Sequence, residues 1–339
     1  MAQPSRPLEV LIVGCGNIAG GFDAQRDMAD WPLSHAGAYR RNGGFRLAAC
    51  VEPDPERRAR FMTRWSVPTG AAAVQELEHQ HFDVISICSP TTLHAGHLEQ
   101  ALALRPRAIF CEKPLTPSLA ASRQWVQACE DQGVALAVNH TRRWAPDARQ
   151  LRENLQSGAW GAVRSVIGHY NKGILNNGSH LLDLLLWLLG PLEVDWVGSP
   201  VADFWADDPT IPAVLRTSEG IPVHLSAAHA GDYALFELQI ITARGTVAME
   251  DGGLHWRLRE AAPSPYFPGY RSLAAGSRSE GRYAEAMLNA ASNLHDHLSH
   301  GTPLASTGRT ALAAQLLCET IHQASSGRSI ESLSPGTHP

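Results

Sequence analysis

Short apolar runs alternate with amphipathic segments over the first 138 residues of the chain. Runs rich in β-branched and other apolar residues predict five buried strands, at 8–14, 46–52, 82–90, 107–114 and 134–140. Two amphipathic segments predict helices, at 54–65 and 118–133. Strands that alternate with helices predict βαβ units and a doubly wound parallel sheet, and thus an α/β domain over residues 1–138.

The pattern changes after about residue 140. Helices are predicted at 147–161, 178–190, 281–300 and 308–325, and strands at 163–173, 194–205, 212–217, 221–229, 234–242, 245–250 and 254–259. The stretch 261–281 is rich in Pro, Gly and Ser and predicts a surface loop. Successive strands of this kind predict a second, α+β domain over residues 139–339 with an open, largely antiparallel sheet. The last helix of this domain can pack back on the first domain.

Composition narrows the function classes. The 339 residues carry a net charge of −5, which gives no general attraction to nucleic acid. The six cysteines form no CxxC pair, as expected of reduced thiols in the cytoplasm. The apolar stretch 181–190 contains Asp183 and is too short to span a bilayer. We expect a soluble cytoplasmic protein without a metal, because the histidines of 295–300 have no partners at ligand spacing beyond Asp296.

A glycine-rich turn follows the first predicted strand. Gly14, Gly16 and Ala19 have the G-x-G-x-x-(G/A) spacing, with Asn17 and Ile18 inside the turn. Gly14 permits a tight turn, Gly16 lets the backbone approach a pyrophosphate, and Ala19 keeps the following helix close to the sheet. The helix amino terminus would face the anionic ligand. The turn predicts dinucleotide binding.

Glu52 ends the second predicted strand and can accept hydrogen bonds from the adenosine ribose. It would repel a 2′-phosphate, so NAD is favoured over NADP, although the nearby Arg57 and Arg58 could hold that phosphate. Glu52 lies 38 residues after Gly14, rather than the usual ~20 from the motif. The surplus falls in residues 20–33, which either form a surface insertion or fold over the bound cofactor or substrate.

Five stretches together resemble one enzyme family. The glycine turn, SPTTLHAGH (89–97), CEKPLTPS (111–118), RRWAPD (142–147) and GSHLLDLLLWLLG (178–190) occur in the order of the Gfo/Idh/MocA oxidoreductases, and residues 300–331 are similar to the family's closing helix. The resemblance implies a Rossmann domain, a nicotinamide cofactor, and a sugar, cyclitol or related substrate. It also implies oligomerisation, as a homodimer or homotetramer through the second sheet, and places Ser89, Pro90, Thr91 and His94 near the dinucleotide.

Lys113 and His180 are the predicted catalytic residues. Ligands of doubly wound sheets bind at the carboxyl ends of the strands, and Lys113 lies at such an end, next to Glu112, which can share the site. An ammonium there can hydrogen-bond the hydroxyl that becomes a carbonyl. Relatives imply a cis bond before Pro114. His180 lies one helical turn before Asp183, which could hold the imidazole in one tautomer.

The sequence departs from the family pattern four residues before His180. Many relatives have an aspartate there that relays the proton with the histidine, whereas this chain has Asn176, which cannot act as a base. Either His180 takes the proton with Lys113, or Asn176 only orients the substrate. The departure leaves room for a redox-neutral sugar lyase or glycosidase that recycles bound NAD; a non-catalytic dinucleotide sensor is a third reading.

The remaining candidates are substrate contacts. Tyr170 and Lys172 are predicted to share one face of a strand that could enter the substrate cleft. An arginine after the fifth strand could bind a carboxylate or phosphate. The predicted substrate residues are Asn139, Arg143, Tyr170, Lys172, Asn177 and Asp183.

Overall fold

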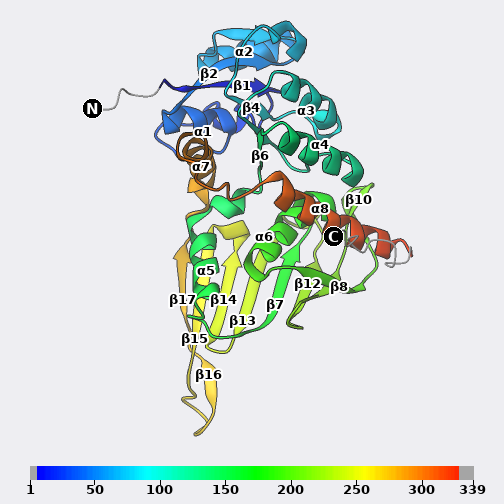
Figure 1. Ribbon diagram of the computed structural model, residues 1–339. Coiled ribbons are helices and arrows are strands. Elements are labelled where there is room, and N and C mark those ends of the chain that lie inside the picture. Colours follow the sequence, from blue (N-terminus) through cyan, green and yellow to red (C-terminus); the bar gives the residue numbers. More distant parts are fainter. Residues whose placement is uncertain (1–5, 328–339) are drawn as a thin grey trace. The chain divides into compact units, whose positions relative to one another are not determined.

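The chain forms two compact units in the computed structural model, which describes residues 6–327 (Figure 1). The first unit comprises the chain up to Ala145 together with residues 284–312. The second comprises Pro146–Tyr283 and the chain from Ala313 onward. Residues 328–331, which end the segment quoted for the resemblance, lie outside the described range.

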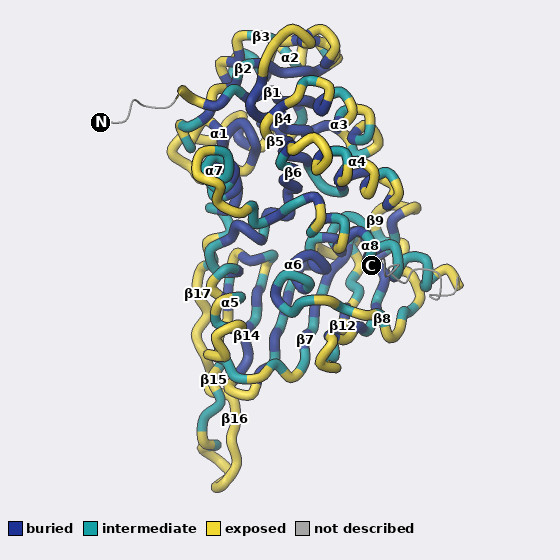
Figure 2. The backbone as a smooth tube through the Cα atoms, viewed as in Figure 1, coloured by how far each residue is buried: buried dark blue, intermediate teal, exposed yellow. Residues whose placement is uncertain are grey.

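The first unit is built on a parallel sheet with the strand order β3-β2-β1-β4-β5-β6. This is the order of a dinucleotide-binding doubly wound sheet, so the predicted fold class is confirmed. The strands are β1 (Leu8–Val13), β2 (Phe45–Val51), β3 (Thr69–Ala71), β4 (Val84–Ile87), β5 (Ala108–Cys111) and β6 (Ala135–Val138). Most residues of these strands are buried, as the dark blue of the tube in Figure 2 shows, because helices cover both faces of the sheet.

The described part of the first unit has five complete α-helices, and four of them lie between consecutive strands of the sheet. They are α1 (His35–Asn42), α2 (Pro55–Trp65), α3 (His94–Ala103), α4 (Leu119–Asp131) and α7 (Ala286–His300). α1 lies beside α7, where Asn42 Nδ2 donates to Ser292 Oγ at 2.9 Å, and α3 lies beside α4 on the opposite side of the sheet (Figure 1). This arrangement leaves the carboxyl ends of β1, β4 and β5 at one edge.

The second unit is built on a mixed sheet with the order β16-β15-β14-β13-β7-β12-β11-β8, with β17 paired to β15. Among the pairings of the described strands in this second sheet, only the β7–β12 pair is parallel. The strands are β7 (Val163–Tyr170), β8 (Leu192–Val197), β11 (Ala213–Thr217), β12 (Pro222–Ala227), β13 (Phe236–Thr242), β14 (Gly245–Glu250), β15 (His255–Pro263), β16 (Arg271–Leu273) and β17 (Ser277–Glu280). The largely antiparallel sheet predicted for this part is confirmed.

One face of this sheet is covered by α5 (Pro146–Gln156) and α6 (Ser179–Leu189), as Figure 1 shows. The α6 residue Leu181 packs so closely that a Cβ on Gly168 would lie 2.8 Å from its Cδ2. Gly168 therefore lets α6 sit directly on β7. The last helix is α8 (Gly308–Ser325).

The structure corrects several predictions of extent. The strand predicted at 194–205 is two strands, β8 and β9 (Val201–Trp205), and β9 pairs with the short β10 (Asp208–Thr210) rather than with the main sheet. The predicted surface loop at 261–281 contains β16 and β17. These strands are three to five residues long, too short for a period of two to be recognised.

Candidate active site

The glycine turn is shaped to receive an anion. Gly14 follows β1 with φ +86°, and a Cβ there would lie 2.8 Å from Ser89 Cα, so only glycine fits. A Cβ on Gly16 would meet no atom within 4 Å. Among the described residues, the amide groups of Gly16, Asn17 and Ile18 donate no hydrogen bond. Free amides beside open space at the start of a helical turn fit a pyrophosphate.

The helix after the turn is interrupted at the stretch where the spacing places the surplus residues before Glu52. Ile18 O and Ala19 O accept from the amides of His35 and Ala36 at 3.1 and 2.8 Å, as in a continuous helix, but the intervening chain leaves and returns. We call residues 20–34 the excursion. It adds 13 residues to the three that a continuous helix would have between Ile18 and His35, which accounts for most of the surplus before Glu52.

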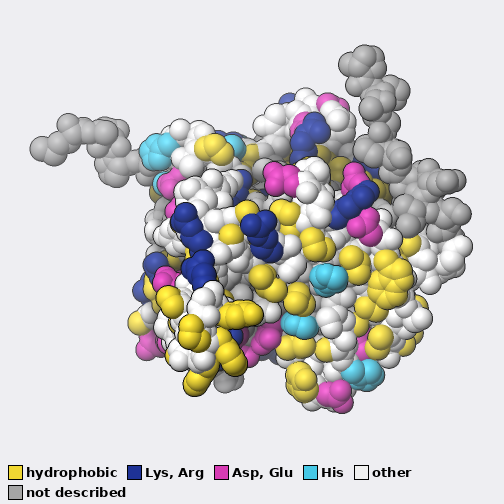
Figure 3. Space-filling model, turned by 90° about the horizontal axis from the view of Figure 1, so that it is seen from below, with side chains coloured by type: hydrophobic (Ala, Val, Ile, Leu, Met, Phe, Trp, Pro, Cys, Tyr) yellow, Lys and Arg dark blue, Asp and Glu magenta, His cyan; other side chains and the backbone are white. Residues whose placement is uncertain are grey.

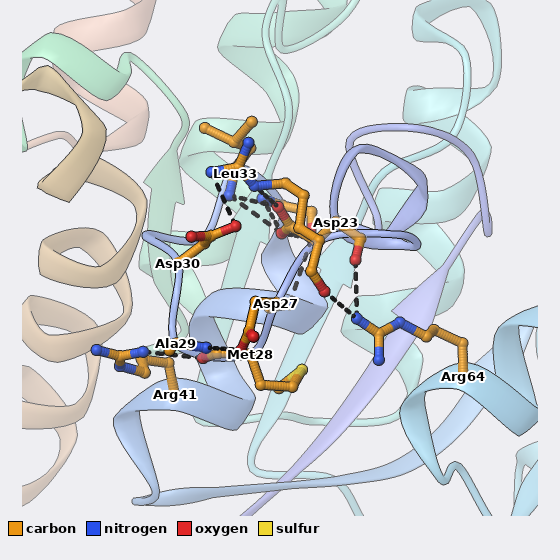
Figure 4. A network of polar contacts seen from close by, with 11 residues as sticks. Asp23, Asp27, Met28, Ala29, Asp30, Leu33, Arg41 and Arg64 are labelled. Atoms are coloured by element: carbon orange, nitrogen blue, oxygen red, sulfur yellow. Dashed lines mark hydrogen bonds and ion pairs between the residues drawn. The ribbon is translucent and has the colours of Figure 1, made fainter.

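The excursion is a structured insertion (Figure 4). The buried Asp23 carboxylate accepts from the amides of Leu33 and Ser34 at 3.0 and 2.9 Å, and Ser34 caps α1 by accepting from Gly37 N. Arg64 of α2 donates to the carbonyl oxygens of Asp23 and Arg26, both at 3.0 Å. Arg41 of α1 donates to Met28 O at 2.8 Å. Within the first unit, the excursion is therefore fixed against α1 and α2.

A cavity of about 310 Å³ lies next to the glycine turn, at the ends of β1 and β2. Glu52 lines it and is 5% exposed; Glu52 Oε2 accepts from Cys15 N at 3.0 Å, and Arg57 Nη1 lies 3.7 Å from Glu52 Oε1. A buried carboxylate at this point fits the ribose of a dinucleotide. The cavity is lined by Val13, Gly14, Val51, Glu52, Pro53, Arg57, Ala72, Ala73, Val74, Gln75, Ser89, Pro90, Leu93, His97 and Gln100.

Two of the four residues taken from SPTTLH line this cavity. Ser89 and Pro90 do, whereas Thr91 begins a short 3₁₀ helix outside it. His94 is fully buried behind the turn, where its Nε2 contacts Ser89 O and its Nδ1 contacts Pro114 O, both at 2.9 Å. His94 thus ties two loops together and does not line the cavity. His97 was not predicted; its Nδ1 lies 2.8 Å from Ser89 Oγ, and burial lowers its pKa.

Glu112 and Lys113 follow β5, as predicted, and the expected cis bond before Pro114 is confirmed. Glu112 Oε1 lies 2.6 Å from Asn139 Nδ2 and 2.9 Å from His35 Nε2. Burial raises the pKa of Glu112, but the hydrogen bond and charge of His35, the Asn139 amide and the charge of Lys113 outweigh it and hold this pKa below its usual value. The Glu112 carboxylate is therefore an anion at neutral pH.

Two predicted substrate residues of the first unit have structural contacts. Asn139 binds Glu112, and its Oδ1 accepts from Thr141 Oγ1 at 3.0 Å. Arg143 is 5% exposed and donates from Nη1 to Ala305 O at 3.3 Å. Local sequence could not show this, because the contact joins residues 162 positions apart.

The remaining predicted residues belong to the second unit. A single π-helical segment, Gly173–Gly178, leads directly into α6 and contains Asn176 and Asn177. No side chain caps the start of α6 at this junction, where Ser179 Oγ donates to Asn176 O at 2.7 Å. His180 is half-buried and Asp183 is buried, one turn apart on α6. π-Helical turns frequently mark functional positions.

The π-helical segment is fixed by carboxylates that the sequence did not single out. Asp208 accepts from the amides of Leu175 and Asn176 at 2.8 and 2.9 Å. Asp203 accepts from Lys172 N at 2.8 Å. Asn176 Nδ2 donates to Lys172 O at 3.1 Å, which orients its amide.

Tyr170 and Lys172 do not share a strand face. β7 ends at Tyr170, and Lys172 has φ +62°, so the alternation of side chains stops before it. The Tyr170 side chain is fully buried; its hydroxyl donates to Ile211 O at 2.7 Å and accepts from Ile211 N at 2.9 Å. It is a core residue. Lys172 Nζ lies 5.5 Å from the centre of the Phe204 ring.

Comparison with known proteins agrees with this geometry. Residues 8–140 match the family described as "Oxidoreductase family, NAD-binding Rossmann fold". Inositol 2-dehydrogenase of Rhizobium meliloti is 23% identical over 84% of this chain and 91% of its own length. Several other curated relatives align over only about half of their length.

Solved structures show the same fold along nearly the whole chain. An oxidoreductase from Agrobacterium radiobacter, solved with NAD⁺, L-tartaric acid and magnesium, has a TM-score of 0.76 at 18% identity and covers 96% of this chain and 99% of its own. The WlbA dehydrogenase from Bordetella pertussis, solved with NADH and UDP-GlcNAcA, has a TM-score of 0.74 at 17% identity, covering 95% and 97%.

No helix within residues 6–327 combines the length and apolar character needed to cross a bilayer. The glycine turn, the Glu52 cavity and the match over residues 8–140 agree on one assignment. Residues 8–140 match the NAD-binding Rossmann domain of the Gfo/Idh/MocA oxidoreductases, the family that the sequence motifs resemble.

Proposed function

We propose that the chain is a dehydrogenase that transfers a hydride between NAD(H) and a hydroxyl-bearing or carbonyl carbon of a sugar, a sugar derivative or a cyclitol. The observation that carries the cofactor assignment is the glycine turn, whose free amides lie beside open space next to the Glu52 cavity. Relatives named as inositol, D-glucoside and D-apiose dehydrogenases support the substrate class.

In this proposal the residues of the first unit bind the cofactor and handle one proton. The amides of Gly16, Asn17 and Ile18 bind the pyrophosphate, and Glu52 binds the adenosine ribose. NAD, when bound, supplies the carbon that accepts the hydride. Lys113 takes the hydroxyl proton as the carbon–hydrogen bond breaks, so the alcohol becomes a carbonyl and the ammonium carries the proton away.

Residues 139–339 form the proposed substrate and assembly domain, with His180 as the second proton-handling residue. Asn176 orients substrate, because its amide is fixed by Lys172 O and cannot accept a proton at neutral pH. Asn177, Lys172 and Asp183 are the other proposed contacts. Asp183 acts by holding His180, because its own side chain is 1% exposed.

The deciding experiment replaces Lys113 with alanine. A panel of cyclitols, free sugars and sugar nucleotides is screened with wild type by NADH absorbance at 340 nm, and NADH affinity is measured by fluorescence. We expect the kcat of the Lys113→Ala variant on the best substrate to be ~10²–10⁴-fold lower than that of wild type. Its NADH affinity should stay within a few fold of the wild-type value. Unchanged turnover would reject the role of Lys113.

A redox-neutral reaction on recycled NAD is the alternative that Asn176 favours, because one proton-transfer group of the family pattern is missing here. The purified protein would then contain bound NAD and convert a glycoside without added cofactor. Mass spectrometry of the denatured protein, followed by turnover in cofactor-free buffer, separates the two reactions.

A homodimer or homotetramer through the second sheet is the proposed assembly. The face away from α6 presents the neighbouring side chains of Trp196, Val214 and His224, and Trp196 is 55% exposed. Seen from below, exposed hydrophobic side chains gather in patches between charged ones (Figure 3). Light scattering should give a multiple of the 36.7 kDa chain mass, reduced in a Trp196→Glu variant.

A further inference from the structure

A buried polar chain runs from the core of the first unit to the residue before Lys113. Tyr39 OH lies 2.6 Å from Ser86 Oγ, and Ser86 Oγ lies 3.3 Å from His35 Nδ1. His35 Nε2 then lies 2.9 Å from Glu112 Oε1. His35 and Ser86 are 0% exposed and Tyr39 is 1% exposed. These residues come from α1, β4 and the end of β5, so the chain forms only in the folded unit.

The chemistry of the partners fixes the direction of these hydrogen bonds. The ionised Glu112 carboxylate only accepts, so His35 Nε2 carries a hydrogen and donates. Tyr39 keeps its phenol hydrogen because burial raises its pKa far above the working range. Tyr39 therefore can donate to Ser86, and Ser86 to His35 Nδ1, which gives every hydroxyl hydrogen a partner. This series of hydrogen bonds ends at the Tyr39 phenol, which does not ionise. The series therefore orients His35 and does not conduct protons.

The placement of His35 depends on the excursion. His35 is the first residue of α1, and its amide donates to Ile18 O. Ser34, which precedes it, is fixed by Asp23 through both its amide and its hydroxyl. The last residues of the excursion therefore set the position of the His35 imidazole. His35 continues the helical turn that begins at the amides proposed to bind the pyrophosphate.

We propose that His35 is a positioning residue for the catalytic loop: it holds the Glu112 carboxylate, as an anion and in one orientation, next to Lys113. This inference rests on the proposed function of Lys113. Burial raises the pKa of Glu112, and without His35 this effect would be opposed mainly by Asn139 and Lys113. Glu112 would then bind a proton at higher pH. An uncharged Glu112 would no longer stabilise the neighbouring ammonium, and its side chain would be free to turn.

The other titratable groups near Glu112 are two thiols that carry no charge. Cys88 and Cys111 lie close by, but burial raises the pKa of both thiols well above the usual value, and they stay neutral across the working range. Of the nearby titratable groups, His35 therefore acts on Glu112 through its hydrogen bond, and Lys113 acts through its charge.

The first test does not need turnover. A double-mutant cycle combines His35→Leu and Glu112→Gln, with the free energy of unfolding measured in urea at pH 7. Glu112→Gln alone removes a paired anion, whereas in the His35→Leu background it removes a poorly paired one. We expect Glu112→Gln to be clearly less destabilising in that background. Additive effects would overturn the pairing. If His35→Leu does not fold, His35→Ala, which also removes the donor to Glu112, replaces it in the cycle.

The second test measures kcat and KM between pH 5 and 9 with the best substrate. His35→Leu should develop an acid limb, with kcat at pH 5.5 at least threefold lower relative to pH 8 than in wild type, and an unchanged NADH affinity. His35→Gln keeps a donor near the Nε2 position and should largely restore the profile. Tyr39→Phe, the matched control, leaves His35 and Glu112 in contact and should show no new limb.

The outcomes separate the two proposals. A His35→Leu variant with the wild-type pH profile overturns the positioning role. A wild type that converts no sugar rejects the proposed function, and the unfolding cycle then decides alone whether His35 sets the state of Glu112.

Discussion

Two glycines of the same turn should respond in opposite ways to one added methyl group. Gly14 has φ +86°, and a Cβ there would lie 2.8 Å from both Ser89 Cα and Ser89 N. Both contacts are with backbone that cannot move aside easily. Gly16 has no atom within 4 Å of the same position. Gly14→Ala therefore tests the fold, and Gly16→Ala tests the ligand.

The magnitudes follow from these contacts. The left-handed backbone costs alanine roughly 1–2 kcal/mol, and the overlap with Ser89 adds about 1–3 kcal/mol, so Gly14→Ala should lower the free energy of unfolding by about 2–5 kcal/mol. Gly16→Ala should change the free energy of unfolding by less than about 1 kcal/mol. Its methyl group would occupy the space next to the amides and weaken NADH binding by about 1–3 kcal/mol, or roughly 5- to 150-fold.

The assays are urea unfolding followed by circular dichroism and NADH titration followed by fluorescence, both on the full chain. The m-value should stay constant, so that changes in midpoint report the folded state. A Gly16→Ala variant with wild-type NADH affinity would show that the pyrophosphate does not bind at this turn. A Gly14→Ala variant with wild-type stability would refute the steric reasoning.

Three further substitutions test separate parts of the structure. Glu52→Gln keeps an acceptor for Cys15 N but removes the charge beside Arg57, so the ratio of NADPH to NADH affinity should rise on the order of tenfold; an unchanged ratio would exclude Glu52 as the selecting residue. Tyr170→Phe leaves Ile211 N and O without their buried partner and should lower the free energy of unfolding by about 1–3 kcal/mol, with an unchanged KM; a raised KM with unchanged stability would instead support the substrate role. Asp23→Asn should loosen the excursion, and limited proteolysis would detect this as faster cleavage. A variant as resistant to the protease as wild type would show that the Asp23 carboxylate does not hold the excursion.

The regular elements of the first unit follow from local sequence, and its longest-range contacts do not. β1, β2, α2 and α4 have strong periodic patterns and Gly or Pro signals at their ends, so their bounds agree with prediction to within about two residues. β3 has only three residues and no pattern to read. The contact of His35 with Glu112 joins residues 77 positions apart, so no local window contains it.

The candidate site shows the same division between residue type and environment. The glycine turn and the Glu52 position follow from strand ends and spacing, because parallel strands deliver their carboxyl ends to one edge. The burial of Tyr170 does not follow from the sequence, because the local pattern around a tyrosine at a strand end does not distinguish a side chain in a cleft from one in the core. The π-helical turn before α6 also has no recognised signal in the sequence; its support comes from Asp208 on another strand.

The way in which the excursion rejoins α1 makes this point of the chain tolerant of changes in length. Because Ile18 and Ala19 accept from His35 and Ala36 as though the helix had never been left, residues can be gained or lost in between without rotating the helix that follows. Natural variation in size can thus accumulate beside the cofactor turn while the imidazole keeps its angular position.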